Sequence, residues 1–341
     1  MSRLKIAGRV VLGLSAVLVV AGGGGYFWAQ RTAEATLARV FDTHRVDFPI
    51  PFPLGEAEIE ALRAERLAAM PAPDAAVTVD PGAPPADPLA GVDLDAIALE
   101  RAQARGKHLV ESRYACIECH GDDFGGGTML DDPAIGTLLG PNLTGGKGGR
   151  TSAFTAAEWD RKVRHGVSPE GRPGAMPSGD FVGMTDRELS DVVSYVRAQP
   201  PVDRTMAPIK LGPLGTLLLA VGEIRLSADD VPDHHAAHAV EPPDGSDPLA
   251  LGKHLAQVCT GCHNPRLSGG PMAGGDPSWA EPANLTAAPD GLAGWTRDDF
   301  FRALREAKSK DGRALSAPMD AMPKYMTKAT DAELDALWTY V

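Results

Sequence analysis

The sequence predicts a mainly helical protein in which two similar domains follow an apolar N-terminal helix. Three observations predict it: an uncharged stretch over residues 10–29, a Cys-x-x-Cys-His run that occurs twice, and a capped helical pattern that closes each half. The 341 residues are enough for two or three domains. A charged content of 23% excludes a wholly disordered chain, and 38 glycines and 29 prolines argue against a helix-only bundle.

The charge balance bears on the partners. The chain carries 33 basic and 45 acidic residues, a formal net charge of −12. An acidic surface repels phosphate backbones, so we expect no nucleic-acid partner. The same charge suits docking on a basic protein.

The N-terminus predicts a membrane anchor. Residues 1–9 carry Arg3, Lys5 and Arg9, and the uncharged residues 10–29 are long enough to cross the roughly 30 Å of a bilayer as a helix. The positive charges place residues 1–9 in the cytoplasm. We therefore expect a single transmembrane helix in a bacterial inner membrane, with everything after residue 29 in the periplasm. A signal peptide cleaved near residues 32–35 is the alternative.

The two halves are repeats. Each contains Gly-Lys-His-Leu before the cysteine run, a Gly-rich loop after it, then Asn-Leu-Thr, Gly-Arg, and a final helix that begins with a Thr-x-x-Glu capping box. The repeats define domains at residues 95–200 and 247–341. Residues 30–94 are expected to hold a helix over 55–70 and a Pro- and Ala-rich spacer. Residues 201–246 form a linker, whose apolar stretch 214–222 is too short to span a membrane and suits a surface.

The chemistry depends on the four cysteines. Cys-x-x-Cys-His is the attachment sequence for c-type haem: two thiols one helical turn apart bond the porphyrin, and the adjacent imidazole ligates the iron. A zinc site would need further ligands, and a redox dithiol needs no histidine. We therefore predict two covalently bound haem c groups with iron. They are held by Cys116, Cys119 and His120, and by Cys259, Cys262 and His263.

The second axial ligand should come from a methionine loop in each domain. In the first domain we favour Met176, which precedes Pro177; Met184 and His165 are the alternatives. A thioether is a soft ligand that favours ferrous iron. In the second domain we favour Met322, with Met319 as the main alternative and Met326 as a third.

Other polar positions carry weaker predictions. Asn142 and Asn284 fit glycosylation sequons, but their repetition favours a loop against the haem, with a nearby carbonyl accepting the N–H of the proximal imidazole. His108 and His254 are expected at the surface. The linker residues His234, His235 and His238 are expected to be solvated rather than metal-binding.

The chain resembles a membrane-anchored dihaem cytochrome c with two class-I-like cytochrome domains. The resemblance rests on the two attachment runs, the Asn-Leu-Thr loops, the two Met-Pro pairs and the terminal helices. It extends to the cytochrome subunits of membrane-bound alcohol and aldehyde dehydrogenases, which usually carry three haems. The resemblance implies helices that cross where Gly106 meets Tyr195, and where Gly252 meets Tyr340 or Trp338.

The predicted function is electron transfer without substrate turnover. Two iron atoms with both axial positions filled suit outer-sphere transfer in a respiratory chain. The expected partners are a quinol- or substrate-oxidising complex, a terminal oxidase or a soluble cytochrome. The alternatives are an electron-accepting subunit of a periplasmic dehydrogenase and a dihaem peroxidase, which needs an open haem. A dihaem sensor is disfavoured because the sequence shows no output domain.

Overall fold

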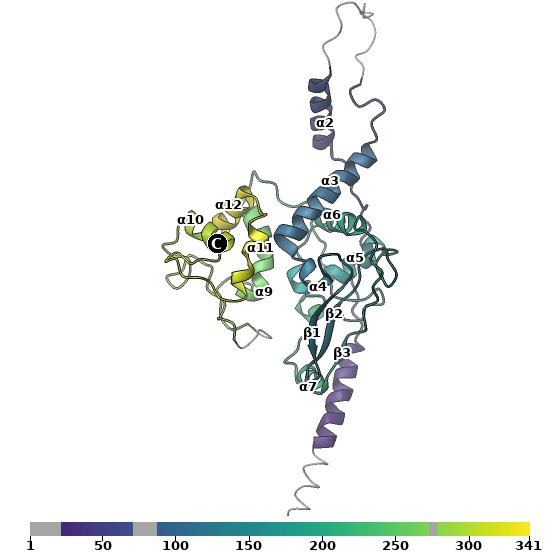
Figure 1. The fold of residues 1–341 in the computed structure, drawn as a ribbon, viewed down its shortest axis with the longest axis vertical. Helices are drawn as coiled ribbons and strands as arrows, with labels where there is room; N and C mark the ends of the chain where they lie inside the picture. Colours follow the sequence, from purple (N-terminus) through teal and green to yellow (C-terminus); the bar gives the residue numbers. More distant parts are fainter. Residues whose placement is uncertain (1–21, 71–86, 273–277) are drawn as a thin grey trace, which may run out of the picture.

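The computed structural model describes residues 22–70, 87–272 and 278–341 (Figure 1). Of the predicted anchor, residues 10–21 lie outside this range, and residues 22–29 begin a helix that runs to residue 37. Within the described residues, no helix is both long and apolar enough to cross a membrane. Most of the spacer at residues 71–88 also lies outside the described range.

The first domain is a small helical unit. Its elements are α3 (Leu94–Leu109), the π-helix η1 (Val110–Tyr114), α4 (Ile117–His120), α5 (Ala156–Val163), the 3₁₀ turn η2 (Ser178–Asp180) and α6 (Asp186–Arg197). Helix α3 crosses α6 at Gly106, where a Cβ atom would lie 2.0 Å from the carbonyl oxygen of Asp191 and 2.9 Å from Cβ of Tyr195. The crossing between Gly106 and Tyr195 is therefore confirmed.

The second domain repeats this order. Its elements are α8 (Pro248–Leu255), η4 (Ala256–Cys259), α9 (Thr260–His263), α10 (Arg297–Glu306), η5 (Met319–Ala321), α11 (Pro323–Met326) and α12 (Asp331–Tyr340). Helix α8 crosses α12 at Gly252, where a Cβ atom would lie 1.9 Å from the Ala336 carbonyl oxygen and 2.9 Å from Cβ of Tyr340. The predicted contact is confirmed for Tyr340.

Local sequence explains where the main helices begin. Capping boxes open α5, α6, α10 and α12, with a threonine at each N-cap and a carboxylate three residues later. Each pair of helices then buries equivalent side chains. Trp159 and Phe300 occupy the same position in α5 and α10, four residues after the cap, and both are buried.

The segment predicted to be a Gly-rich loop in the first domain contains β-strands instead. It forms an antiparallel hairpin of β1 (Gly127–Asp132) and β2 (Gly136–Gly140), extended by β3 (Lys210–Leu211) from the linker. The linker strand adds a long-range pairing to the end of β2, which glycine content does not reveal. Helix α2 (Glu56–Ala69) precedes the first domain, and it confirms the helix predicted over residues 55–70.

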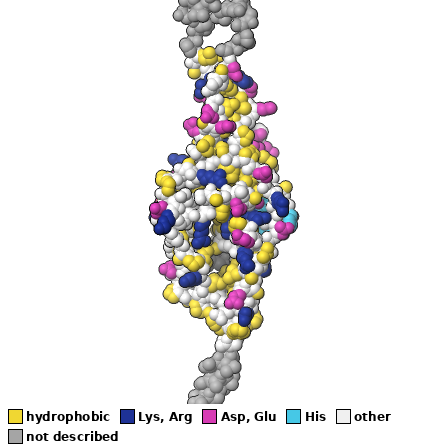
Figure 2. Space-filling view, turned by 90° about the vertical axis from the view of Figure 1, so that its right-hand side faces the viewer, with side chains coloured by type: hydrophobic (Ala, Val, Ile, Leu, Met, Phe, Trp, Pro, Cys, Tyr) yellow, Lys and Arg dark blue, Asp and Glu magenta, His cyan; other side chains and the backbone are white. Residues whose placement is uncertain are grey.

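The linker packs on the first domain rather than hanging free. Its apolar stretch forms α7 (Pro213–Val221), followed by the 3₁₀ turn η3 (Ser227–Asp230). Leu219 of α7 is buried in a cluster with Ala33 of the N-terminal helix and with Leu226, whereas Leu214 and Leu217 are each 42% exposed. Charges of both signs are interspersed on the face seen in Figure 2, so on that face the acidic excess is not gathered into one patch.

Candidate haem sites

The first attachment run lies on the short helix α4. His120 is buried, and its Nδ1 donates a hydrogen bond to the carbonyl oxygen of Pro141 at 3.0 Å. This bond fixes the ring and leaves Nε2 as the atom with a free lone pair. Burial lowers the pKa of His120, so the imidazole is neutral and suited to ligate iron.

The second run on α9 repeats this geometry. His263 is buried, and its Nδ1 donates to the carbonyl oxygen of Ala283 at 2.7 Å. Pro141 and Ala283 immediately precede Asn142 and Asn284, so the predicted carbonyl partner of each proximal imidazole is confirmed. The same hydrogen bond in two separate folding units indicates a shared requirement at the iron rather than a chance contact.

The Asn-Leu-Thr loops are held by side-chain turns. In each loop the asparagine Oδ1 accepts from the backbone N–H and hydroxyl of the threonine two residues later, at 2.7–2.9 Å. Asn142 is 1% exposed and donates to Val202 and Arg204 of the linker, so its amide is not free for glycosylation. These turns position the carbonyls that face the histidines.

The surroundings of the four cysteines disfavour a thiolate, because burial raises the pKa of each thiol. All four cysteines are unpaired. Burial raises the pKa of Cys116 to about 12 and that of Cys259 to about 11. A redox-active or zinc-binding cysteine instead needs a thiolate, whose pKa its surroundings lower. The pockets therefore favour neutral sulfur at these positions.

The first domain also holds buried donors without partners. Among the described residues, Trp159 Nε1 and Tyr114 Oη are buried and make no hydrogen bond. Both belong to the hydrophobic core that contacts Cys116 and Met176. Haem carries two propionates, and a buried carboxylate needs donors of this kind. The residues present thus fit a haem.

The candidate axial methionines lie in the loops before the final helices. Met176 is half-buried and contacts the first core, while Met184 is 2% exposed within it. His165 is engaged elsewhere, with Asp160 and three other histidines. In the second domain Met319, Met322 and Met326 are all half-buried. Met176, and the choice of Met322 over Met319, therefore stay predictions.

Comparison with known proteins agrees with this geometry. The family "Cytochrome C oxidase, cbb3-type, subunit III" matches residues 101–196, and the family "Cytochrome c" matches residues 249–341. The chain contains two cytochrome c domains. It is an electron-transfer protein with two covalently bound haem c groups, one in each domain.

The relatives are subunits of dehydrogenases. The chain is 27% identical to the cytochrome c subunit of a quinone alcohol dehydrogenase from Gluconacetobacter polyoxogenes, over 66% of this chain and 52% of that protein. It is 25% identical to the fructose dehydrogenase cytochrome subunit of Gluconobacter japonicus, over 69% and 51%. A gluconate 2-dehydrogenase cytochrome c subunit from Pantoea cypripedii is 26% identical, over 70% and 58%. The chain thus spans about half the length of the curated relatives it matches.

The two cytochrome domains contact each other through reciprocal pairs. His108 of the first domain donates to Glu333 of the second at 2.8 Å, and His254 of the second donates to Glu188 of the first at 2.9 Å. The histidines come from the two Gly-Lys-His-Leu motifs, and the glutamates are the N3 residues of the two final capping boxes. An approximate twofold axis therefore relates the domains, as in an isologous dimer.

The attachment helices show the same reciprocal relation. Glu118 of α4 contacts Tyr325 of the second domain. Gly261 occupies the equivalent position in α9 and lies against the carboxylate of Asp180 in the first domain; a Cβ atom on Gly261 would be 2.3 Å from that carboxylate. Figure 1 shows the domains side by side, with α9 and α11 toward the first domain. The interface thus brings both haem attachment helices to the domain boundary.

One half of the interface is strengthened by an insertion. The segment between the Gly-Lys-His-Leu motif and the first cysteine is three residues longer in the first domain than in the second. The extra length forms η1. Arg113 of η1 donates to Glu188 at 2.7 Å and to the carbonyl oxygen of His254 at 2.8 Å. His254 is therefore buried, at 7% exposure, and its predicted surface position is wrong. His108 is half-buried against Glu333.

Proposed function

We propose that the chain is a membrane-anchored dihaem cytochrome that passes single electrons between redox proteins on the periplasmic side of a bacterial inner membrane. The observation that carries the proposal is the domain interface, where the attachment helix of each haem contacts the other domain. Haem c supplies a reversible one-electron couple at iron. This chain's residues fix the proximal imidazoles, exclude water from them and hold the two sites together.

The interface gives the electron an internal path. Glu118 and Gly261 sit within the two attachment runs, and both contact the other domain. The clamp of Arg113, Glu188 and His254 is almost fully buried, which limits relative movement of the domains. We therefore propose that one domain receives the electron and the other donates it.

The membrane position is supported by two features of the described residues. Phe27 and Trp28 are 60% and 52% exposed on the helix over residues 22–37, at the end of the uncharged stretch. Helix α7 packs against that same helix and exposes Leu214, Leu217 and Val221. Aromatic and apolar side chains at one end of a molecule suit the interface of a bilayer.

A more specific role is that of the electron-accepting subunit of a dehydrogenase complex. This proposal comes from the relatives, whose names assign them to alcohol, fructose and gluconate dehydrogenases. The test is to add each of these substrates to membranes that contain or lack this chain and to follow haem c reduction. Substrate-dependent reduction that needs the chain supports the subunit role. Unchanged rates in its absence refute it.

The electron-carrier function is tested on the haem-loaded full chain by an optical redox titration. We expect two one-electron steps, with the near-infrared methionine–iron band in both oxidised haems and no binding of added cyanide at low concentration. One haem without the band that binds cyanide readily, together with turnover of hydrogen peroxide, would favour the peroxidase instead. Extraction of membranes at alkaline pH separately tests the anchor, since a cleaved signal peptide would leave the protein in the supernatant.

A further inference from the structure

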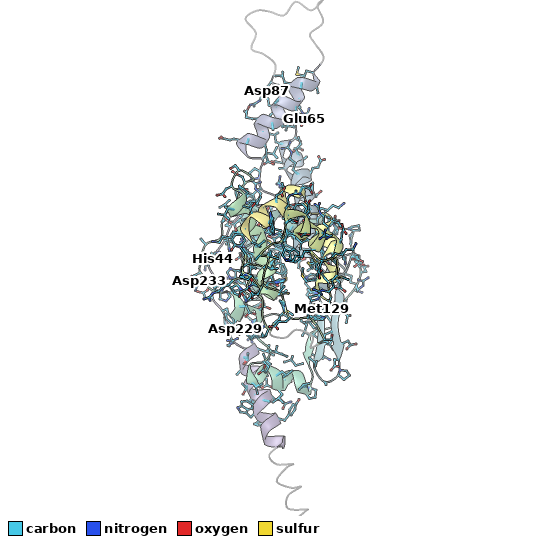
Figure 3. All side chains as sticks on the ribbon, turned by 90° about the vertical axis from the view of Figure 1, so that its left-hand side faces the viewer. His44, Glu65, Asp87, Met129, Asp229 and Asp233 are labelled. Carbon is cyan, nitrogen blue, oxygen red and sulfur yellow. The ribbon has the colours of Figure 1, made fainter. Side chains whose placement is uncertain are left out.

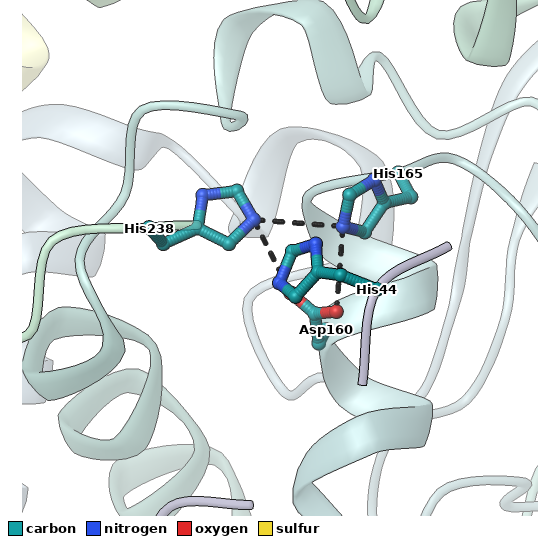
Figure 4. A group of neighbouring side chains, drawn as sticks. All are labelled: His44, Asp160, His165 and His238. Carbon is teal, nitrogen blue, oxygen red and sulfur yellow. Dashed lines mark hydrogen bonds and ion pairs between the residues drawn. The ribbon is translucent and has the colours of Figure 1, made fainter. Parts of the chain in front are cut away.

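Four side chains outside the haem sites converge on one point (Figure 4). They are His44, which follows the N-terminal helix (also labelled in Figure 3); Asp160 and His165, in and just after α5; and His238 of the linker. One ligand atom from each lies within 4.8 Å of all the others. The prediction that the linker histidines are solvated is wrong for His234 and His238, because both pack against His165.

The distances are close to those of a tetrahedral metal site. His165 Nε2 lies 3.4 Å from Asp160 Oδ2 and 3.5 Å from His238 Nε2, and His238 Nε2 lies 3.6 Å from Asp160 Oδ1. With zinc–ligand bonds of about 2.0–2.1 Å, neighbouring ligand atoms of a tetrahedron are about 3.3 Å apart. Small side-chain movements would therefore bring Asp160, His165 and His238 into coordination, and the ligand atom of His44 lies within 4.8 Å of theirs.

Surrounding hydrogen bonds set the tautomers that a metal needs. His234 Nε2 donates to the Ala228 carbonyl oxygen at 3.0 Å, so its Nδ1 accepts from Nδ1 of His165 at 3.0 Å. His44 Nδ1 donates to the His234 carbonyl oxygen at 3.1 Å. The free lone pairs of His165 and His44 are therefore on Nε2, the atoms that face the cluster. Such outer hydrogen bonds orient histidine ligands in metal sites.

Two of these ligand atoms are buried without a hydrogen-bond partner. Asp160 and His165 are 0% exposed, and Asp160 Oδ2 makes no hydrogen bond. His44 Nε2 is likewise buried and unpaired. A buried polar atom without a partner is costly, and a cation at this point would satisfy both.

The local charge balance tolerates a divalent ion. Arg164 is the nearby cation, and it is already paired with Asp160 at 2.7 Å and with Asp186 at 2.8 Å. Neutral imidazoles and a carboxylate are the forms that bind metal.

We propose that His44, Asp160, His165 and His238 bind one zinc ion. Three imidazole nitrogens and one carboxylate oxygen match the preference of zinc, and four protein ligands make a closed, structural site. The ion would join the N-terminal segment, the first cytochrome domain and the linker. It would thereby fix the first haem domain to the segment that follows the predicted anchor.

The test uses the haem-loaded full chain without an affinity tag that binds metal. The protein is stripped with a chelator, reloaded with zinc and dialysed, and its zinc and iron are measured. We expect one zinc for every two haem irons, and a zinc X-ray absorption spectrum with nitrogen and oxygen neighbours only. His238→Asn and His44→Gln should each weaken zinc binding at least tenfold. His235→Asn is the matched control, since His235 is an exposed linker histidine outside the cluster, and it should bind as the parent does.

The outcomes separate this proposal from the proposed function. Zinc below stoichiometry after reloading, sulfur neighbours in the spectrum, or unchanged affinity in His238→Asn would each overturn it. The stoichiometry and spectrum of the parent chain decide the matter even where a variant folds poorly. None of these readings depends on electron transfer, so a redox titration can succeed or fail independently.

Discussion

Replacement of Glu188 by glutamine tests the domain interface most directly. Burial acts to raise the pKa of Glu188, but the hydrogen bond from His254 and the charge of Arg113 outweigh it and hold the pKa at about 2, against an ordinary value of 4.5. At about 1.36 kcal/mol per pKa unit, this difference corresponds to about 3 kcal/mol of folding stability at pH 7. The one oxygen of the glutamine side chain in Glu188→Gln can still accept from the Thr185 backbone N–H, but its NH2 group cannot accept from Arg113 or His254. The loss therefore reports the charge and the hydrogen bonds of the interface together.

The pH dependence has a definite sign. Because the pKa is lowered on folding, the stabilisation is complete above pH 4.5 and declines as the pH falls toward about 2. We expect Glu188→Gln to lower the free energy of unfolding by about 3 kcal/mol at pH 7 and by about 1 kcal/mol at pH 3. Urea unfolding of the haem-loaded protein, followed by far-ultraviolet circular dichroism at both pH values, provides the measurement.

The equivalent position gives a matched control. Glu333→Gln removes the other reciprocal pair, in which His108 is 35% and Glu333 is 23% exposed. Because water screens this pair, we expect a smaller loss than at Glu188. Equal losses at the two positions, or a Glu188→Gln variant as stable as the parent at pH 7, would refute the reasoning.

Two further predictions concern the helix crossing and the second haem. Gly106→Ala should destabilise the first domain by about 2–3 kcal/mol, because the added methyl group would lie 2.0 Å from a backbone carbonyl oxygen. Thermal unfolding measures this loss. Gly145→Ala is the control and should change stability little, since a Cβ atom there has nothing within 4 Å. Met322→Leu should abolish the near-infrared methionine band of one haem and lower its potential, whereas Met319→Leu should leave both unchanged. The reverse pattern would assign the ligand to Met319.

Some features of this protein follow from the sequence alone because they depend on residues close together in the chain. An attachment run needs only five consecutive residues, so both haem sites could be located directly. A capping box spans four residues, and Thr185 and Thr330 therefore marked the starts of α6 and α12. The helix crossings at Gly106 and Gly252 were implied by the resemblance to class-I-like cytochromes, which itself rests on short motifs that both domains repeat.

Contacts between distant segments were decided only by the tertiary structure. The residues around His254 do not distinguish it from an exposed histidine on a helix. It is buried because Glu188, 66 residues away, lies on the facing domain. The histidine cluster joins three segments whose spacing matches no metal motif, so only folding reveals it. Local preference acts over a few residues, whereas burial and charge pairing depend on which surfaces the chain brings together.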